Sequence, residues 1–340
     1  MRCVIERFGA ALALVCASSL ALAHHSSAPF DEKAEVALEG TVTKYEWANP
    51  HVYIFLDGVD TASQRRATWE IEGPPPSLLK QRGWSRESLA TGERVKVDAH
   101  PARDPTRSAA LLVSVTKSDG TTLSRSGGDA PAPTFKADGL TGTWVTQINE
   151  ETSALFDDDS LEAPGIWPLT AGALQAARDF HEDTDLSGLR CIPYTAPLFM
   201  LIPDAKSIEQ HGATITIRGE FDGAERTVHL DVASHDGAEP SLQGHSIGHW
   251  DGRVLVVDTA GFVEHRNGTS WSVPSSTHKH LVERFELAAD GKSLSYRFEL
   301  DDPEYLARPL AAEARWSYRP DVTYHAEPCD PANARRFVAH

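Results

Sequence analysis

Five histidines lie between Gly244 and Leu287, in a stretch that joins two strand-like runs through a polar loop: His245, His249, His265, His278 and His280. Histidine titrates at about pH 6.5 and is both a proton shuttle and a common metal ligand. The stretch therefore predicts acid/base chemistry or metal binding. Joint ligation by His245 and His249 is disfavoured, because four residues along a strand separate them by about 13 Å.

The segment from Thr277 to Leu287 has the pattern of a strand with two different faces. Successive strand residues point to opposite sides, so one face carries His278, His280, Val282, Arg284 and Glu286, and the other carries Leu281, Glu283, Phe285 and Leu287. If the more apolar face lines a barrel, Glu283 is buried, requires a partner and is the leading general acid/base. If the histidine face points inward, His278 and His280 line the pocket and Arg284 anchors an anion. A structural ion pair is the alternative for Glu283 and Arg284.

Asp258 and a set of predicted ligand contacts complete the predicted site. Asp258 ends an apolar run and is either a base in the pocket or a cap on the following turn. The predicted catalytic residues are Glu283, His278, His280 and Asp258, and the predicted ligand contacts are Trp144, Arg284, Trp250 and His245.

The first residues predict export. Arg2 and Arg7 precede an apolar run that ends in the small-residue cleavage pattern Ala21-Leu22-Ala23, so residues 1–23 are predicted to be a signal peptide. The run is about 15 residues long, short of the roughly 20 that a spanning helix needs, and no later segment competes with it. We expect a periplasmic or secreted protein without membrane insertion.

Cysteine content agrees with an oxidising compartment. Cys3 and Cys16 leave with the signal peptide, so Cys191 and Cys329 are predicted to form a disulfide. A catalytic role is disfavoured, because neither cysteine lies in a motif that activates a thiolate.

Net charge and missing motifs exclude several function classes. The formal charge of −17 opposes binding to nucleic acid, which requires clustered Lys and Arg. The chain contains no His-Glu-x-x-His zinc helix, phosphate loop or dinucleotide fingerprint. Gly244-His245-Ser246-Ile247-Gly248 fits the Gly-x-Ser-x-Gly pattern, but its all-β context lacks the strand-to-helix turn that a nucleophile elbow requires. Whether the protein is an enzyme therefore stays open.

Residues 24–123 are predicted to form the first domain. Five short strand-like runs lie between Val36 and Gly120, with a helix over 77–89 between the third and the fourth. This order predicts a small barrel of the oligonucleotide/oligosaccharide-binding (OB) type. Its motifs resemble those of a family of small secreted bacterial domains of unknown function: His24-His25-Ser26, Gly40-Thr41-Val42, Trp47, Asn49-Pro50-His51, Gly83-Trp84 and Gly92. The resemblance implies a fold and export, without an activity.

Residues 124–138, rich in Ser, Gly, Ala and Pro, are predicted to be a linker to a second domain over 139–340. Six strand-like runs and several Asp-Gly turns predict an antiparallel barrel, preceded by a helix over 169–183 with Thr170 as N-cap. Gly142-Thr143-Trp144 is typical of the first strand of lipocalin-like proteins, where an arginine of the last strand packs over the tryptophan. Arg315 or Arg319 is expected in that place.

The second domain resembles a lipocalin-type domain of exported bacterial proteins that is also uncharacterised. The motifs that carry this resemblance are Cys191-x-Pro193, Ser246-x-Gly248-x-Trp250-x-Gly252, Val256-Val257-Asp258-Thr259, Gly261-Phe262, Leu281-Val282-Glu283-Arg284, Asp301-Asp302-Pro303 and Pro309. The usual pattern has an acidic residue in place of His245 and a basic one in place of His249, so this chain departs from it at both.

The predicted function is to hold a small, largely apolar molecule in the second barrel. Acid/base chemistry on that ligand, of the lyase, isomerase or hydrolase type and without a required cofactor, is the enzyme version of this prediction. The alternative is copper or zinc binding by His24, His25 and His51, because a free N-terminal amine and imidazoles suit these metals. That alternative requires cleavage directly before His24.

Overall fold

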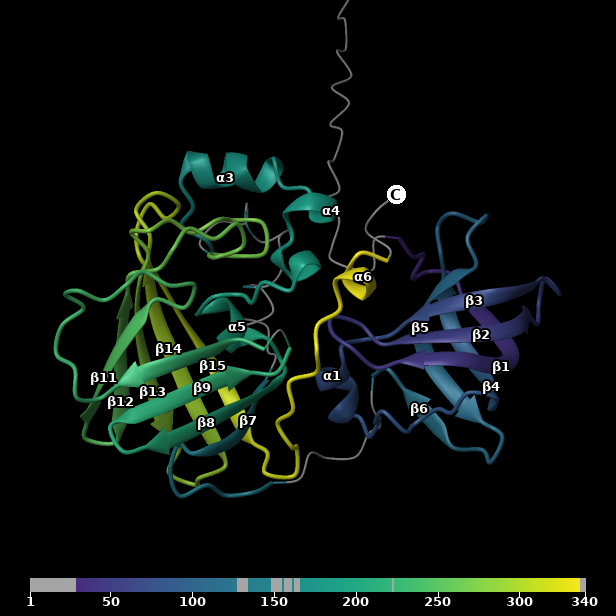
Figure 1. Ribbon diagram of the computed structural model, residues 1–340, viewed down its shortest axis with the longest axis horizontal. Coiled ribbons are helices and arrows are strands. Elements are labelled where there is room, and N and C mark those ends of the chain that lie inside the picture. Colours follow the sequence, from purple (N-terminus) through teal and green to yellow (C-terminus); the bar gives the residue numbers. More distant parts are fainter. Residues whose placement is uncertain are drawn as a thin grey trace, which may run out of the picture.

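The protein forms two closed β-barrels that lie side by side (Figure 1). The computed structural model describes residues 29–126, 134–147, 155, 161, 166–221 and 223–336. The prediction of an all-β fold is confirmed. The predicted domain boundaries stay predictions, as does the signal peptide, which lies outside the described residues.

The first barrel contains five strands: β1 (Val36–Glu46), β2 (Tyr53–Asp60), β3 (Arg66–Glu72), β4 (Arg94–Pro101) and β5 (Ala109–Lys117). The strands pair in the order β3-β2-β1-β4-β5, and a parallel pairing of β3 with β5 closes the barrel. A short strand, β6 (Thr122–Ser124), extends β5. Helix α1 (Pro76–Lys80) lies between β3 and β4. This topology confirms the OB-type prediction.

Alternation of side chains explains the core of the first barrel. Leu38 and Val42 on β1 are fully buried beside Ile54 and Leu56 on β2, while the intervening residues are more exposed. Gly40 is required on β1, because a Cβ there would lie 2.5 Å from the carbonyl oxygen of Asp57. The predicted helix is confirmed only for its first part, since Gly83 with φ of 82° follows its end.

The second barrel has nine strands: β7 (Gly142–Gln147), β8 (Ala205–His211), β9 (Thr214–Gly219), β10 (Glu225–His229), β11 (His245–Asp251), β12 (Val254–Ala260), β13 (His280–Leu287), β14 (Ser293–Asp301) and β15 (Leu310–Tyr318). Neighbours are antiparallel except β10 and β11, and β15 pairs with β7 to close the barrel. The prediction of a second closed β-barrel is confirmed, and its expected antiparallel pairing is corrected at β10 and β11. The sequence did not predict β8 or β11 as strands, because their polar residues mask the alternation.

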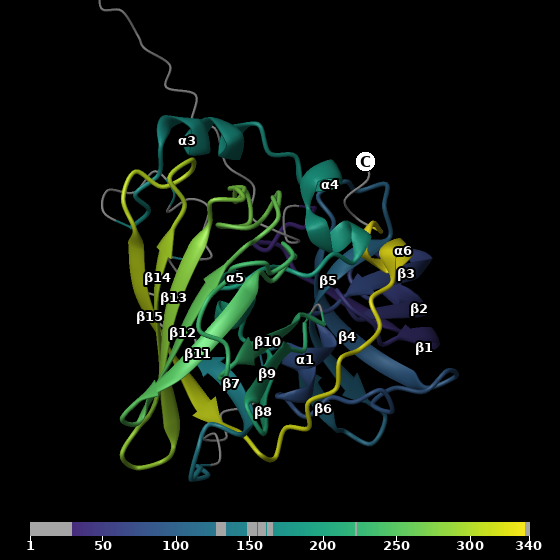
Figure 2. The same cartoon turned by 60° about the vertical axis from the view of Figure 1, so that its left-hand side comes forward.

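Short helices lie between β7 and β8. They are α3 (Ala171–Arg178), α4 (Glu182–Asp185), a 3-10 turn η2 (Ser187–Arg190) and α5 (Leu198–Leu201). Thr170 caps α3 as predicted, since its hydroxyl accepts a hydrogen bond from the backbone N–H of Ala173 at 3.1 Å. Figure 2 shows α3 and α4 at one end of the barrel. None of the helices in the described residues is long and apolar enough to cross a membrane.

Trp144 is fully buried in the core of the second barrel, and its indole N–H donates to the carbonyl of Leu140 at 2.7 Å. The expectation that an arginine packs over it is corrected. Tyr318 packs there, with its ring centre 5.1 Å from that of Trp144. Arg315 is exposed on β15, and Arg319 is bonded to Asp321.

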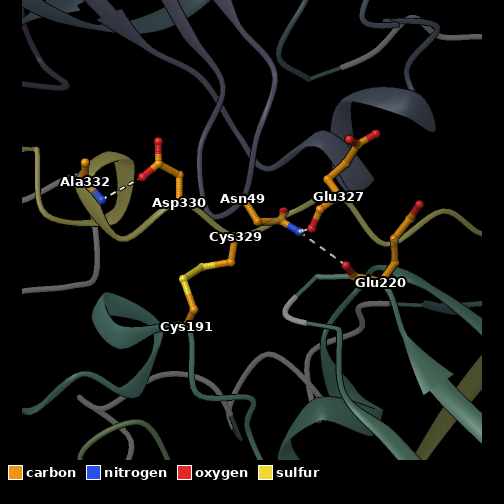
Figure 3. The surroundings of a disulfide bond; sticks show 7 residues. All are labelled: Asn49, Cys191, Glu220, Glu327, Cys329, Asp330 and Ala332. Carbon is orange, nitrogen blue, oxygen red and sulfur yellow. Dashed lines mark hydrogen bonds between the residues drawn. A yellow bond between two sulfur atoms is a disulfide. The ribbon is translucent and has the colours of Figure 1, made fainter.

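The predicted disulfide between Cys191 and Cys329 is confirmed (Figure 3). It joins the end of η2 to the tail that follows β15, which carries the short helix α6 (Pro331–Ala334). Beside it, the backbone of Asn49 pairs with the tail, accepting from Asp330 at 3.1 Å and donating to Pro328 at 3.2 Å. The tail of the second barrel is thereby attached to the β1–β2 loop of the first.

Buried polar contacts strengthen this attachment. The indole N–H of Trp47 donates to Glu327 at 3.0 Å, and Arg86 forms an ion pair with the same carboxylate. Lys80 of α1 pairs with Glu220, the residue directly after β9. Burial raises the pKa of Glu220 to about 6, although Lys80 opposes this shift. These contacts hold the two barrels in one arrangement.

We predict that replacing both cysteines, Cys191→Ser with Cys329→Ser, lowers the free energy of unfolding by about 4 to 5 kcal/mol, because the disulfide closes a long loop in the unfolded chain. The two residues are separated by 138 positions. Urea unfolding followed by tryptophan fluorescence measures the effect. A reducing agent is expected to destabilise the wild type and leave the variant unchanged. Equal stability of both proteins under oxidising conditions would contradict the prediction.

Candidate functional site

Strand β13 places Glu283 inside the second barrel. Leu281, Glu283 and Phe285 are all fully buried, whereas Arg284 between them is exposed. The more apolar face of this strand therefore points inward, which was the first of the two orientations considered from the sequence. A carboxylate in such surroundings needs charged or hydrogen-bonding partners.

Two residues on other strands supply those partners. The hydroxyl of Tyr296 on β14 donates to Oε1 of Glu283 at 2.8 Å. Nη1 of Arg226 on β10 lies 2.7 Å from Oε2, and both side chains of this ion pair are almost completely buried. The pair is close but not aligned as a hydrogen bond, and none of the three guanidinium nitrogens has a hydrogen-bond partner among the described residues.

Lys279 brings a second buried basic group. Its Nζ donates to Oγ1 of Thr195 at 2.8 Å and to the carbonyl of Gly268 at 2.7 Å, and it lies 4.7 Å from the centre of the Phe262 ring. Burial lowers the pKa of Lys279 to about 7, although the charges of Asp302 and Glu283 oppose this shift. Lys279 was missed from the sequence, although it directly precedes β13 and the alternation of that strand places it on the inward face.

Aromatic rings surround this group of residues. The ring of Tyr296 lies 5.2 Å from that of Phe285 and 5.3 Å from that of Trp316. Burial raises the pKa of Tyr296 well above its ordinary value, so its hydroxyl stays protonated and donates. We call Arg226, Lys279, Glu283 and Tyr296 the interior polar cluster.

A different cluster lies on the outer wall of the second barrel. Oδ1 of Asp258 on β12 is 3.1 Å from Nε2 of His280 on β13 and 2.9 Å from Nε2 of His235 in the β10–β11 connection. Nδ1 of His235 is in turn 2.9 Å from Nδ1 of His245 on β11, whose ring stacks on that of His229. We call these five residues the outer histidine cluster.

Hydrogen bonds tune the acidity of this outer cluster. Burial opposes ionisation of Asp258, but the bonds from His235 and His280 outweigh it and hold the pKa of Asp258 below its usual range. Burial, together with His235 and His229, lowers the pKa of His245. The described residues contain no group of three or more His, Cys, Asp or Glu side chains that could hold a metal ion.

The predicted catalytic residues thus lie on two sides of the barrel wall. Asp258 and His280 come together outside, with the predicted ligand contact His245, whereas Glu283 lies inside. His229 and His235 were missed, because the fold rather than a local pattern brings His235 to Asp258 and His229 to His245. His278 is exposed, with Nδ1 2.8 Å from a carboxylate oxygen of Glu304.

The remaining predicted ligand contacts are also divided. Trp144 is the one that lies in the barrel core. Trp250 at the end of β11 is 44% exposed, and Arg284 points outward with the other alternate residues of β13. A ligand inside the barrel would therefore contact the interior polar cluster and not these two side chains.

The predicted metal ligands are only partly placed. His24 and His25 lie outside the described residues. His51 lies in the β1–β2 loop of the first barrel, where its Nδ1 donates to the carbonyl of Gly73 at 3.3 Å. It lines a cavity of about 390 Å³ at one end of that barrel.

A family model matches the first part of the chain. Residues 11–111 match a family of unknown function, DUF6152, so this part of the chain is similar to an uncharacterised domain. No curated protein matches the chain. The match ends within β5 and assigns no activity to either barrel.

We predict that Lys279→Met flattens the pH dependence of stability between pH 7 and pH 10. In this range the unfolded chain keeps a proton on Lys279 (ordinary pKa 10.5) that the folded chain has lost, so stability rises with pH in the wild type. The variant should lose up to about 1.4 kcal/mol of this rise per pH unit.

Urea unfolding at several pH values measures the slope. Lys292→Met is the matched control, because this lysine is exposed beside β14 and its replacement leaves the interior unchanged. A slope that is the same in Lys279→Met and the wild type contradicts the lowered pKa assigned to this buried amine.

Proposed function

We propose that this is an exported protein whose second barrel binds a small, largely apolar molecule that carries one neutral hydrogen-bond acceptor, such as a carbonyl or a hydroxyl group. The sequence of residues 1–23 supports export, and the disulfide is typical of oxidising compartments. The walls of the barrel support an apolar ligand. Barrels of about eight strands have interiors that side chains fill or that hold one small ligand.

The observation that carries the proposal is the state of Arg226. Arg226 is 3% exposed, and its guanidinium group faces an interior built from aromatic and aliphatic side chains. Guanidinium donors in such surroundings are strongly stabilised by an acceptor. A ligand oxygen beside Arg226 would provide that acceptor.

Charge balance favours a neutral ligand group over an anion. Glu283 already neutralises Arg226, and burial lowers the pKa of Lys279 to about 7, so its amine carries only part of a positive charge at neutral pH. A second anion would lie close to the Glu283 carboxylate in surroundings where repulsion is weakly screened. The acceptor is therefore expected to be uncharged.

The contacts of Glu283 favour binding over catalysis. One carboxylate oxygen accepts from Tyr296 and the other is paired with Arg226, so both are engaged. A general base needs a free oxygen within reach of the substrate proton. The acid/base version of the proposal requires Arg226 to release Glu283 when the ligand binds.

The test uses prodan, a neutral naphthalene ketone whose fluorescence shifts to the blue in apolar surroundings, and its analogue in which the ketone is reduced to a methylene group. The wild type is expected to bind the ketone at least about ten-fold more tightly, because the ketone accepts a hydrogen bond from a buried cation. Energy transfer from the barrel tryptophans to the dye measures both affinities.

The informative variant is the pair Arg226→Met with Glu283→Leu. Replacing both members of a buried ion pair with apolar residues avoids an unpaired charge and is often neutral or stabilising. The variant should bind the ketone and its analogue equally, while the control Arg253→Met, at an exposed position in the β11–β12 turn, keeps the preference. A preference that survives in the paired variant, or no binding of prodan to the wild type, refutes the proposal.

A further inference from the structure

We propose that the cavity at the end of the first barrel is a second binding site, which takes a small organic anion: a carboxylate or phosphonate on an apolar body. The site is separate from the second barrel and shares no residue with the interior polar cluster. The cavity holds about 390 Å³, within the range of small-molecule pockets.

Segments far apart in the first barrel build this cavity. The β1–β2 loop contributes His51, the end of β3 contributes Glu72, α1 contributes Leu78, and the segment after β6 contributes Arg125. The loops around β1–β2 and the β2–β3 face are where OB-type barrels commonly bind ligands. The cavity is therefore formed by the parts of the barrel that are suited to binding.

Two arginines give the cavity positive charge. Arg82 and Arg125 both line it, and the Arg82 guanidinium donates to the backbone carbonyl of Arg125. Burial and the nearby Arg125 charge lower the pKa of Arg82. Neither arginine forms an ion pair with a carboxylate in the part of the chain that the structure describes. An anion between the two guanidinium groups would relieve their repulsion.

A buried carboxyl group faces the same cavity. Glu72 is 3% exposed, and its Oε2 accepts from Tyr53 at 2.9 Å. Its Oε1 lies 3.6 Å from Nδ1 of His51 and has no hydrogen-bond partner among the described residues. Burial raises the pKa of Glu72, and His51, Tyr53 and Arg125 only partly oppose this. A protonated Oε1 can donate a hydrogen bond to the ligand. Nε2 of His51 can also contact the ligand, because Nδ1 of the same ring donates to Gly73.

The rest of the lining selects an apolar body. Pro74, Pro75, Leu78 and Leu111 form the walls beside the charged groups. Free inorganic phosphate would leave these walls uncovered, whereas an aromatic or aliphatic anion contacts both parts. The cavity thus differs from the second barrel, whose charges are already balanced and whose ligand is expected to be neutral.

Isothermal titration calorimetry of the protein without residues 1–23 tests the site, with benzoate and phenylphosphonate as probes and benzyl alcohol as the neutral control. At least one anion is expected to bind the wild type at least about ten-fold more tightly than the alcohol. Arg125→Gln should weaken that binding about ten-fold, and inorganic phosphate should bind more weakly than phenylphosphonate.

Two controls separate the site from other effects. Arg253→Gln, an exposed arginine of the second barrel, should leave benzoate binding unchanged, and Arg125→Gln should leave prodan binding unchanged. Thermal unfolding confirms that Arg125→Gln is folded, and Arg82→Lys provides a second variant that keeps the charge but loses the planar donor pair. Failure of both anions to bind, equal binding of benzyl alcohol, or binding that is insensitive to both variants overturns the proposal.

Discussion

The burial of Glu283 is the constraint on which the second barrel depends. A carboxylate enclosed by aliphatic and aromatic residues is costly unless charge and hydrogen bonds compensate it. Arg226 and Tyr296, from two other strands, provide this compensation. The three groups come together only when the barrel closes. The contacts that compensate the burial of Glu283 therefore also place polar groups inside an otherwise apolar barrel.

The two barrels present different chemistry to a ligand. In the second barrel, Arg226 is neutralised by Glu283 within an apolar wall. In the first, Arg82 and Arg125 lie together at a cavity whose carboxyl group, Glu72, has a raised pKa. The disulfide tail holds the barrels together, so a neutral ligand and an anionic one would be held in a fixed relation by one chain.

Sequence reasoning was accurate where the relevant contacts are local. Alternation along β13 gave a buried Glu283 that needs a partner as one of two orientations, and the order of strands and helix predicted the OB-type barrel. It did not identify Arg226 as the partner, because pairing across a barrel depends on closure and register. Lys279 was within reach of the same alternation rule. His235 was not, since it lies in a connection without a periodic pattern and reaches Asp258 only in the folded chain.

The most direct test of the central claim is native mass spectrometry of the protein purified under non-denaturing conditions from the cells that make it. The account predicts an additional mass of a few hundred daltons on the wild type, which organic extraction releases as a neutral molecule and which is absent from the variant carrying Arg226→Met and Glu283→Leu. A wild-type mass equal to that of the processed chain with nothing extracted, or an adduct retained equally by that variant, would contradict the assignment of the second barrel as a binding site organised by Arg226.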